Sequence, residues 1–297
     1  MDKRPQPEYI EKRRVRVLKT ALFVAVLFVL GVVLLSITLF YIIPLGPAVE
    51  RAAGLIKERT GLVVTEGAVE RSFPFGIEAR AVTVKGAGGE PLVYLEALRA
   101  RLRPLSLITG KVVLPVNAST NGGIIDGVVT VRPGSAALRL ALADVGFSEF
   151  PALRDRVELE GSFGGDVFLT VPEGGCPEGF VRLEGTGLKG GSIRFMGMPL
   201  PIGWIERAGF RAELKGCKAE VKGLWLEGGD ISMRLKGTVF FERPLQESRL
   251  DLTVEVIPKG KLLERDYMLR LLEPYRKSAN YYLIPVTGTL GRPRAGG

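Results

Sequence analysis

The segment "GGIIDGVVTVRPG" (residues 122–134), followed by "AALRLALADVGF" (residues 136–147), indicates how this chain folds. Apolar side chains recur at nearly every second position in both runs, and Pro133 and Gly134 separate them. Alternation with a period of two is typical of a β-strand that has one apolar and one polar face, and Pro-Gly is a turn signal. We therefore expect strands separated by turns.

Runs of the same kind extend from Leu62 to about Val256, and glycine or proline separates them. The clearest are "GIEARAVTVKG", "GKVVLPVNAST", "DVFLTVPEGG", "FVRLEGTG", "DISMRLKGTVFFERP" and "SRLDLTVEVIP". Many short strands with turn signals between them predict an antiparallel all-β fold. A short motif, Leu followed by Glu or Lys and then by Gly, recurs at irregular spacing. The irregular spacing argues against a strict solenoid and favours a meander, in which each strand is added beside the previous one in a single sheet.

The stretch "YLEALRARLRPLSLITGK" (residues 94–111) places Arg99, Arg101 and Arg103 at every second position. The favoured interpretation is the solvated face of a strand. The alternative is an interaction face for an acidic protein partner or for lipid headgroups. No aromatic residue lies between these arginines, so a nucleic-acid partner is not expected.

The stretch "ALFVAVLFVLGVVLLSITLFYII" (residues 21–43) carries no charge. As a helix it would be about 34 Å long, enough to cross a hydrocarbon core of about 30 Å. Residues 1–20 hold more basic than acidic side chains, which by the positive-inside rule keeps them in the cytoplasm. A cleaved signal peptide is the alternative, but its apolar region would be shorter. We expect a single uncleaved transmembrane helix, with everything after it outside the cytoplasm.

Two further segments have helical spacing. "GPAVERAAGLIKERTG" predicts a short juxtamembrane helix within residues 44–61, and "KLLERDYMLRLLEPYRKS" predicts an amphipathic helix over about 261–278, kinked or ended by Pro274. "NYYLIPVTGTLGRP" then returns to a last strand. Residues 62–297 are therefore expected to form a mainly β domain with one or two short helices.

The chain contains no histidine and two cysteines, Cys176 and Cys217. This composition excludes histidine-based nucleophilic catalysis and histidine metal ligands. Outside the cytoplasm the two cysteines are expected to form a disulfide that closes a loop of roughly 40 residues. Two separate buried thiols are the alternative.

No motif selects an enzyme. "GTGLKG" (residues 185–190) has the letters of a dinucleotide fingerprint, but no helix is predicted after it, and we interpret it as a β-turn. Acidic residues such as Glu160, Glu184, Asp230 and Asp251 fall about one to a strand, as solvated strand faces require. We expect no catalytic residues, no cofactor and no metal.

Several pieces together resemble known families. The membrane helix, then "VVTEGAVERSFPFGIEARAVTVKG" and "EPLVYLEALRARLRPLSLITGKVVL", resemble the opening module of AsmA-like periplasmic proteins. "GGDISMRLKGTVFFERPLQESRLDLTVEVIP" and "IPVTGTLGRP" resemble the type II secretion system protein N family (GspN). The resemblance implies an inner-membrane, periplasm-facing protein without catalytic residues. It also implies a twisted antiparallel sheet with an apolar concave side.

The expected function is a non-enzymatic accessory of type II protein secretion that contacts other secretion subunits through its periplasmic β domain. The alternative is an AsmA-like lipid carrier, or an outer-membrane assembly factor, that holds phospholipid in an apolar β groove. The two functions predict different sheet interiors. A carrier leaves its apolar face open, whereas a scaffold closes it against helices such as 261–278 or against a second layer.

Overall fold

The computed structural model describes residues 63–86, 88–151, 157–195, 198–201, 204–242, 245–264, 270 and 272–296, with isolated positions between residues 31 and 57. The chain divides into two compact units, Met1–Leu55 and Ile56–Gly297. Nearly all described residues belong to the second unit.

The predicted membrane span, residues 21–43, falls almost entirely outside the described residues. Its four described positions, Gly31, Thr38, Tyr41 and Ile42, are helical. The described positions within the predicted helix at 44–61 are helical as well. In the described part of the chain, no helix combines the length and the apolar character that crossing a membrane requires.

The second unit is a sheet of 17 strands. The strands are β1 (Val63–Thr65), β2 (Ala68–Ser72), β3 (Gly76–Lys85), β4 (Pro91–Arg101), β5 (Val112–Ser119), β6 (Ile124–Arg132), β7 (Ser135–Gly146), β8 (Val157–Pro172), β9 (Glu178–Phe195), β10 (Met198–Pro201), β11 (Trp204–Lys215), β12 (Lys218–Gly228), β13 (Ile231–Phe240), β14 (Arg249–Pro258), β15 (Arg276–Ser278), β16 (Tyr281–Thr289) and β17 (Arg292–Ala295). Short 3-10 turns connect some of them: η1 (Pro104–Thr109), η2 (Phe147–Glu149), η3 (Leu245–Glu247), η4 (Gly260–Glu264) and η5 (Glu273–Tyr275).

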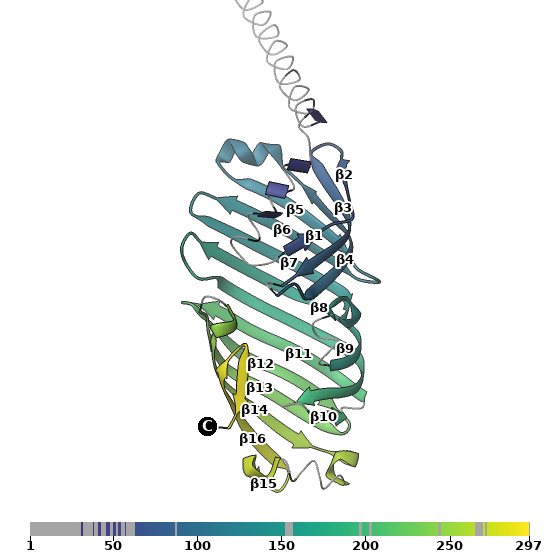
Figure 1. Ribbon diagram of the computed structural model, residues 1–297, viewed down its shortest axis with the longest axis vertical. Helices are drawn as coiled ribbons and strands as arrows, with labels where there is room; N and C mark the ends of the chain where they lie inside the picture. The colour runs from purple at the N-terminus through teal and green to yellow at the C-terminus, as the bar shows by residue number, and fades with distance from the viewer. Residues whose placement is uncertain are drawn as a thin grey trace, which may run out of the picture. The chain divides into compact units, whose positions relative to one another are not determined.

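The strands follow one another along the sheet in nearly the order of the chain. From β2 to β9 each strand pairs antiparallel with the next, β9 pairs with β11, and the series continues through β12, β13, β14, β16 and β17. The short strands β1, β10 and β15 pair with β3, β9 and β16. Figure 1 shows the stack, from β2 and β3 at one end to β16 at the other. The prediction of a mainly β, antiparallel fold is therefore confirmed.

The sheet is a single layer in the described residues. Apart from contacts that η1, η2 and η5 make with strands, every substantial contact between described elements joins two hydrogen-bonded strands. The turn η2 contacts both β8 and β4, although three strands lie between them. Four strand spacings would be about 19 Å in a flat sheet, so the sheet curls toward the side on which η2 lies.

One end of the sheet has a closed core. Nine buried side chains form it: Leu188, Ile205, Ile231, Val254, Val256, Leu262, Leu272, Tyr282 and Ile284. Leu262 belongs to η4 and Leu272 precedes η5, so the connection between β14 and β15 covers the sheet there. Burial of these apolar side chains is the main stabilising contribution at this end.

Two local predictions differ from the structure. The helix predicted over about 261–278 differs at its two ends, where η4 stands at the start and η5 and β15 at the end. Arg270 and Leu272 are helical, and residues 265–269 and 271 lie outside the described residues. Pro274 lacks the amide hydrogen that a continuing helix needs, and β15 begins two residues later. Residues 185–190, interpreted as a turn, lie within β9.

Candidate functional site

The candidate site is one face of the sheet, on which apolar residues pair across strand after strand. Directly paired residues of antiparallel strands point to the same face. Row A crosses twelve strands and consists of Ile77, Ala100, Val116, Gly127, Leu140, Val167, Val181, Ala212, Val221, Gly237, Leu252 and Val286. Every member is aliphatic or glycine.

Two further rows flank row A on the same face. Row B crosses the same twelve strands and consists of Ala79, Leu98, Ala118, Ile125, Leu142, Gly165, Leu183, Phe210, Leu224, Leu235, Val254 and Ile284. Row C runs from β5 to β14 and consists of Leu114, Val129, Leu138, Leu169, Gly179, Leu214, Ala219, Val239 and Leu250. The three rows, which we call the apolar face, contain no polar side chain.

The apolar face is open at one end and closed at the other. From β4 to β8 its residues are half-buried, except for the buried Ala118. At the far end Val254 and Ile284, the last members of row B, belong to the closed core and are 4% and 0% exposed. The half-buried residues from β4 to β8 are partly covered, and η2 contacts both β4 and β8 at the two sides of this stretch.

The turn η2 marks this face as the inner side of the curl. Phe147 in η2 packs against the closed core, and its ring centroid lies 5.1 Å from that of Phe163. Phe163 pairs with Val145, which is fully buried. The sheet therefore curls toward its apolar face.

The opposite face is charged. Its ion pairs join neighbouring strands and include Arg99–Glu78, Arg211–Glu184, Arg207–Glu227 and Lys236–Glu255. Exposed ion pairs of this kind each contribute little to stability. These charged side chains are well solvated, so this face is the one that contacts water and the apolar face lies on the other side of the sheet.

The predicted arginine row belongs to this charged face. Arg99 and Arg101 are exposed members of β4, and Arg103 is exposed directly after it. Arg99 is paired with Glu78, which lowers the pKa of that carboxyl through a hydrogen bond. Neither Arg101 nor Arg103 forms an ion pair within the described residues. A hollow of about 520 Å³ beside Arg99 and Arg101 is also lined by Arg139 and Asp126.

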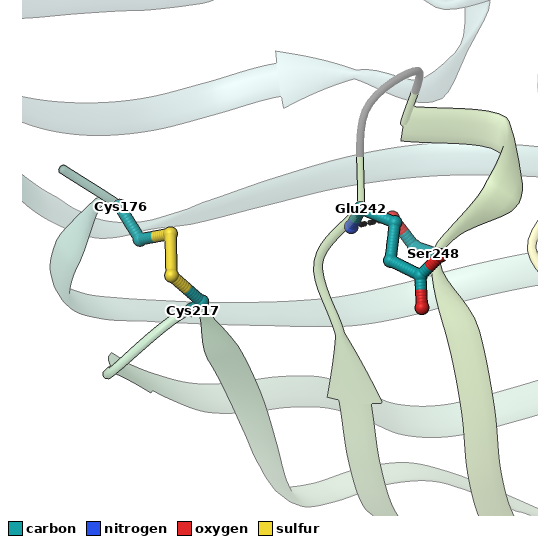
Figure 2. Close-up of a disulfide and its surroundings, with 4 residues drawn as sticks. All are labelled: Cys176, Cys217, Glu242 and Ser248. Atoms are coloured by element: carbon teal, nitrogen blue, oxygen red, sulfur yellow. Dashed lines mark hydrogen bonds between the residues drawn. A yellow bond between two sulfur atoms is a disulfide. The ribbon is translucent and has the colours of Figure 1, made fainter. Parts of the chain in front are cut away.

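The two cysteines meet in turns at the ends of interior strands. Cys176, in the loop between β8 and β9, and Cys217, in the turn between β11 and β12, form a disulfide with a Cα–Cα distance of 4.9 Å (Figure 2). Figure 2 also shows Glu242 donating its backbone N–H to the Oγ of the buried Ser248, at 3.1 Å. The disulfide links the β8–β9 hairpin to the β11–β12 hairpin. These hairpins are also neighbours in the sheet, because β9 pairs with both β8 and β11.

A metal site is not found among the described residues. Among them, no group of three or more Cys, Asp and Glu side chains could hold a metal ion. Comparisons of the chain with protein-family models, with curated proteins and with solved structures found no match. The family resemblance therefore rests on the quoted motifs.

The sequence indicated alternation but not the site itself. Each strand reveals its own apolar face, whereas rows A to C depend on register between strands. Register is set by turn lengths and bulges, which the sequence pattern specifies weakly. The interpretation of Arg99 as part of a solvated face agrees with its placement opposite the rows.

Proposed function

We propose that the apolar face binds the acyl chains of phospholipid and that the chain is an AsmA-like lipid carrier. The observation that supports this proposal is the continuity of rows A and B across twelve strands, about 50 Å at the usual strand spacing. One leaflet of a bilayer has a hydrocarbon depth of about 15 Å, half of the core. The rows therefore offer a track longer than one acyl layer.

The open stretch between β4 and β8 favours a carrier over a closed scaffold. Contiguous exposed apolar surface beyond a few hundred Å² marks a binding site in soluble domains. The half-buried row residues between β4 and β8 leave part of their apolar surface in water, which a ligand would cover. Bound acyl chains would remove it from water without requiring any hydrogen bond.

The proposed setting follows the sequence. We place residues 1–20 in the cytoplasm, residues 21–43 across the inner membrane, and the β domain in the periplasm, with no enzymatic role. The second candidate is the type II secretion accessory that contacts other secretion subunits. The closed core near Leu262 and Leu272 favours it, because a closed end provides a rigid docking platform.

Mass spectrometry of the gently purified full chain tests the proposal. We expect stoichiometric phospholipid on the parent chain. Leu140→Glu, which places a charge in row A on β7, is expected to abolish bound lipid. Ala141→Glu is the matched control: it adds the same charge one residue later on the opposite, exposed face and is expected to retain lipid.

Three outcomes decide between the candidates. Lipid on the parent and on Ala141→Glu, but not on Leu140→Glu, supports the carrier. No lipid on the parent, together with co-purified secretion subunits, supports the accessory and overturns the carrier. Equal lipid on both variants also overturns it, because the lipid would then lie elsewhere. Circular dichroism establishes that both variants retain the β fold.

A further inference from the structure

A corner of the sheet carries apolar side chains that point into water. In η1, between β4 and β5, Leu105 is 79% and Ile108 is 82% exposed, and Leu107 is 48% exposed. Phe73, in the turn between β2 and β3, is 67% exposed. We call these four residues the apolar knob. Single exposed apolar residues need no explanation, but four around one corner do.

The hydroxyls of η1 form hydrogen bonds with nearby backbone groups. The Ser106 hydroxyl donates to the backbone oxygen of Arg103 at 2.6 Å and accepts from the N–H of Val113 at 3.3 Å. The Thr109 hydroxyl donates to the backbone oxygen of Ser106 at 2.8 Å. Gly110 closes the turn in the left-handed region with φ 66°. The turn is thus fixed by hydrogen bonds between its hydroxyls and the backbone, while its apolar side chains face solvent.

Beside the knob lies a hollow of about 420 Å³. It is lined mainly by apolar groups, and its lining includes Pro74, Phe75, Leu102, Leu105 and Val113, with Arg103 as the charged member. An apolar cavity with one cation at its wall matches an acyl chain whose headgroup carries a negative charge.

The chain segment that carries η1 is basic. No acidic residue occurs between Glu96 and Asp126, whereas Arg99, Arg101, Arg103 and Lys111 all fall within that stretch. Arg101 and Arg103 have no ion-pair partner among the described residues. Cations next to exposed apolar side chains are the combination that binds an anionic membrane surface: the apolar groups enter the acyl boundary and the cations contact the headgroups.

We propose that the apolar knob is a membrane-docking element that seats this end of the sheet on a surface of anionic phospholipid. Leu105 and Ile108 enter the boundary between headgroups and acyl chains, and Arg101, Arg103 and Lys111 contact the phosphates. This inference goes beyond the proposed carrier function and does not depend on it, since a secretion accessory would use the same contact.

The test uses the full chain incorporated into vesicles. Because Cys176 and Cys217 are joined, Ile108→Cys provides the one free thiol for an environment-sensitive fluorophore under non-reducing conditions. Glu173→Cys, in the exposed turn between β8 and β9, is the matched control. Vesicles contain phosphatidylcholine with brominated acyl chains, with or without phosphatidylglycerol.

We expect brominated lipid to quench the Ile108 label in vesicles that contain phosphatidylglycerol, and to leave the Glu173 label unquenched. Replacing Arg103 and Lys111 with serine should lower the ratio of docked to undocked knob roughly fivefold for each cation removed. Equal quenching at both positions, or an unquenched Ile108 label, would overturn the proposal. So would quenching that ignores phosphatidylglycerol. Lipid bound to the apolar face is measured separately by mass spectrometry, so the failure of one proposal is distinguishable from the failure of the other.

Discussion

Arg99 on β4 holds the carboxylate of Glu78 on β3 with two hydrogen bonds, from Nε at 2.9 Å and from Nη2 at 3.3 Å. The two residues are directly paired across the strands, so both point away from row A. This contact accounts for the first member of the arginine row as part of a solvated, charged face. The other two members lie at the end of β4, beside η1.

The pKa of Glu78 depends on Arg99. The hydrogen bond from Arg99 lowers the pKa of Glu78 below its ordinary value, and the charges of Arg99 and Arg80 act in the same direction. Arg99→Gln should therefore raise the pKa of Glu78, measured by carbon NMR of the carboxyl group. Arg101→Gln is the control and should leave it unchanged. A depressed pKa stabilises the fold above the ordinary value, near pH 4.3, and this contribution disappears as the pH falls through the lowered pKa. No change on Arg99→Gln would contradict the pairing.

The disulfide should stabilise the sheet. Cys176 and Cys217 are 41 residues apart in sequence, and closing a loop of that length contributes about 4 kcal/mol in the chain-entropy account. Cys217 has a φ of 59° beside Gly216 with a φ of 60°. Asparagine tolerates this left-handed position, so Cys176→Ser/Cys217→Asn isolates the loss of the bridge. We expect this double variant to unfold at a lower urea concentration than the parent protein. Two titratable thiols in the denatured, unreduced parent would refute the bridge.

A backbone irregularity in β7 keeps the apolar face free of charge. Strict alternation would follow Leu142 with Asp144 on that face, but a register shift places Val145 there instead, and Asp144 adopts a φ of 52°. Asp144→Val should destabilise the fold by about 1–3 kcal/mol, because a β-branched residue is strained in this region. Asp144→Gly should be close to neutral. Urea unfolding measures both, and equal stability of the two variants would argue against the shift.

Gly209 on β11 makes room for a tryptophan on β12. A Cβ atom at Gly209 would collide with the ring of Trp225, its cross-strand partner, whereas one at Gly223 would stay 3.5 Å from that ring. Gly209→Ala should displace the indole and cost about 1–3 kcal/mol by overpacking. The emission of Trp225, followed in a Trp204→Phe background, should shift in Gly209→Ala and not in Gly223→Ala. An unshifted spectrum would contradict the packing.

The sequence predicts the sheet well because alternation is a local property. "AALRLALADVGF" indicates which residues of β7 share a face, up to the shift at Asp144. The shift itself is not visible, since an aspartate in the left-handed region and an aspartate on a solvated face look alike in sequence. Row A, in contrast, is a property of twelve strands together, and no single strand reveals it.

The segment after β14 differs from its predicted helix at both ends. Leucines at helical spacing over 261–278 predict one amphipathic helix, yet Leu262 enters the closed core from η4, whereas Leu272 enters it from a helical position. The sequence also does not reveal the apolar knob, because "PLSLITG" gives no indication from spacing alone that Leu105, Leu107 and Ile108 are exposed.

The order of strands along the sheet has a consequence for how such a protein changes over evolutionary time. Each hairpin depends mainly on the strands beside it, so inserting or deleting one would lengthen or shorten the hydrocarbon track by about 10 Å, two strand spacings, and leave the rest unaltered. The length of the apolar face would then be set by the number of hairpins that the chain contains.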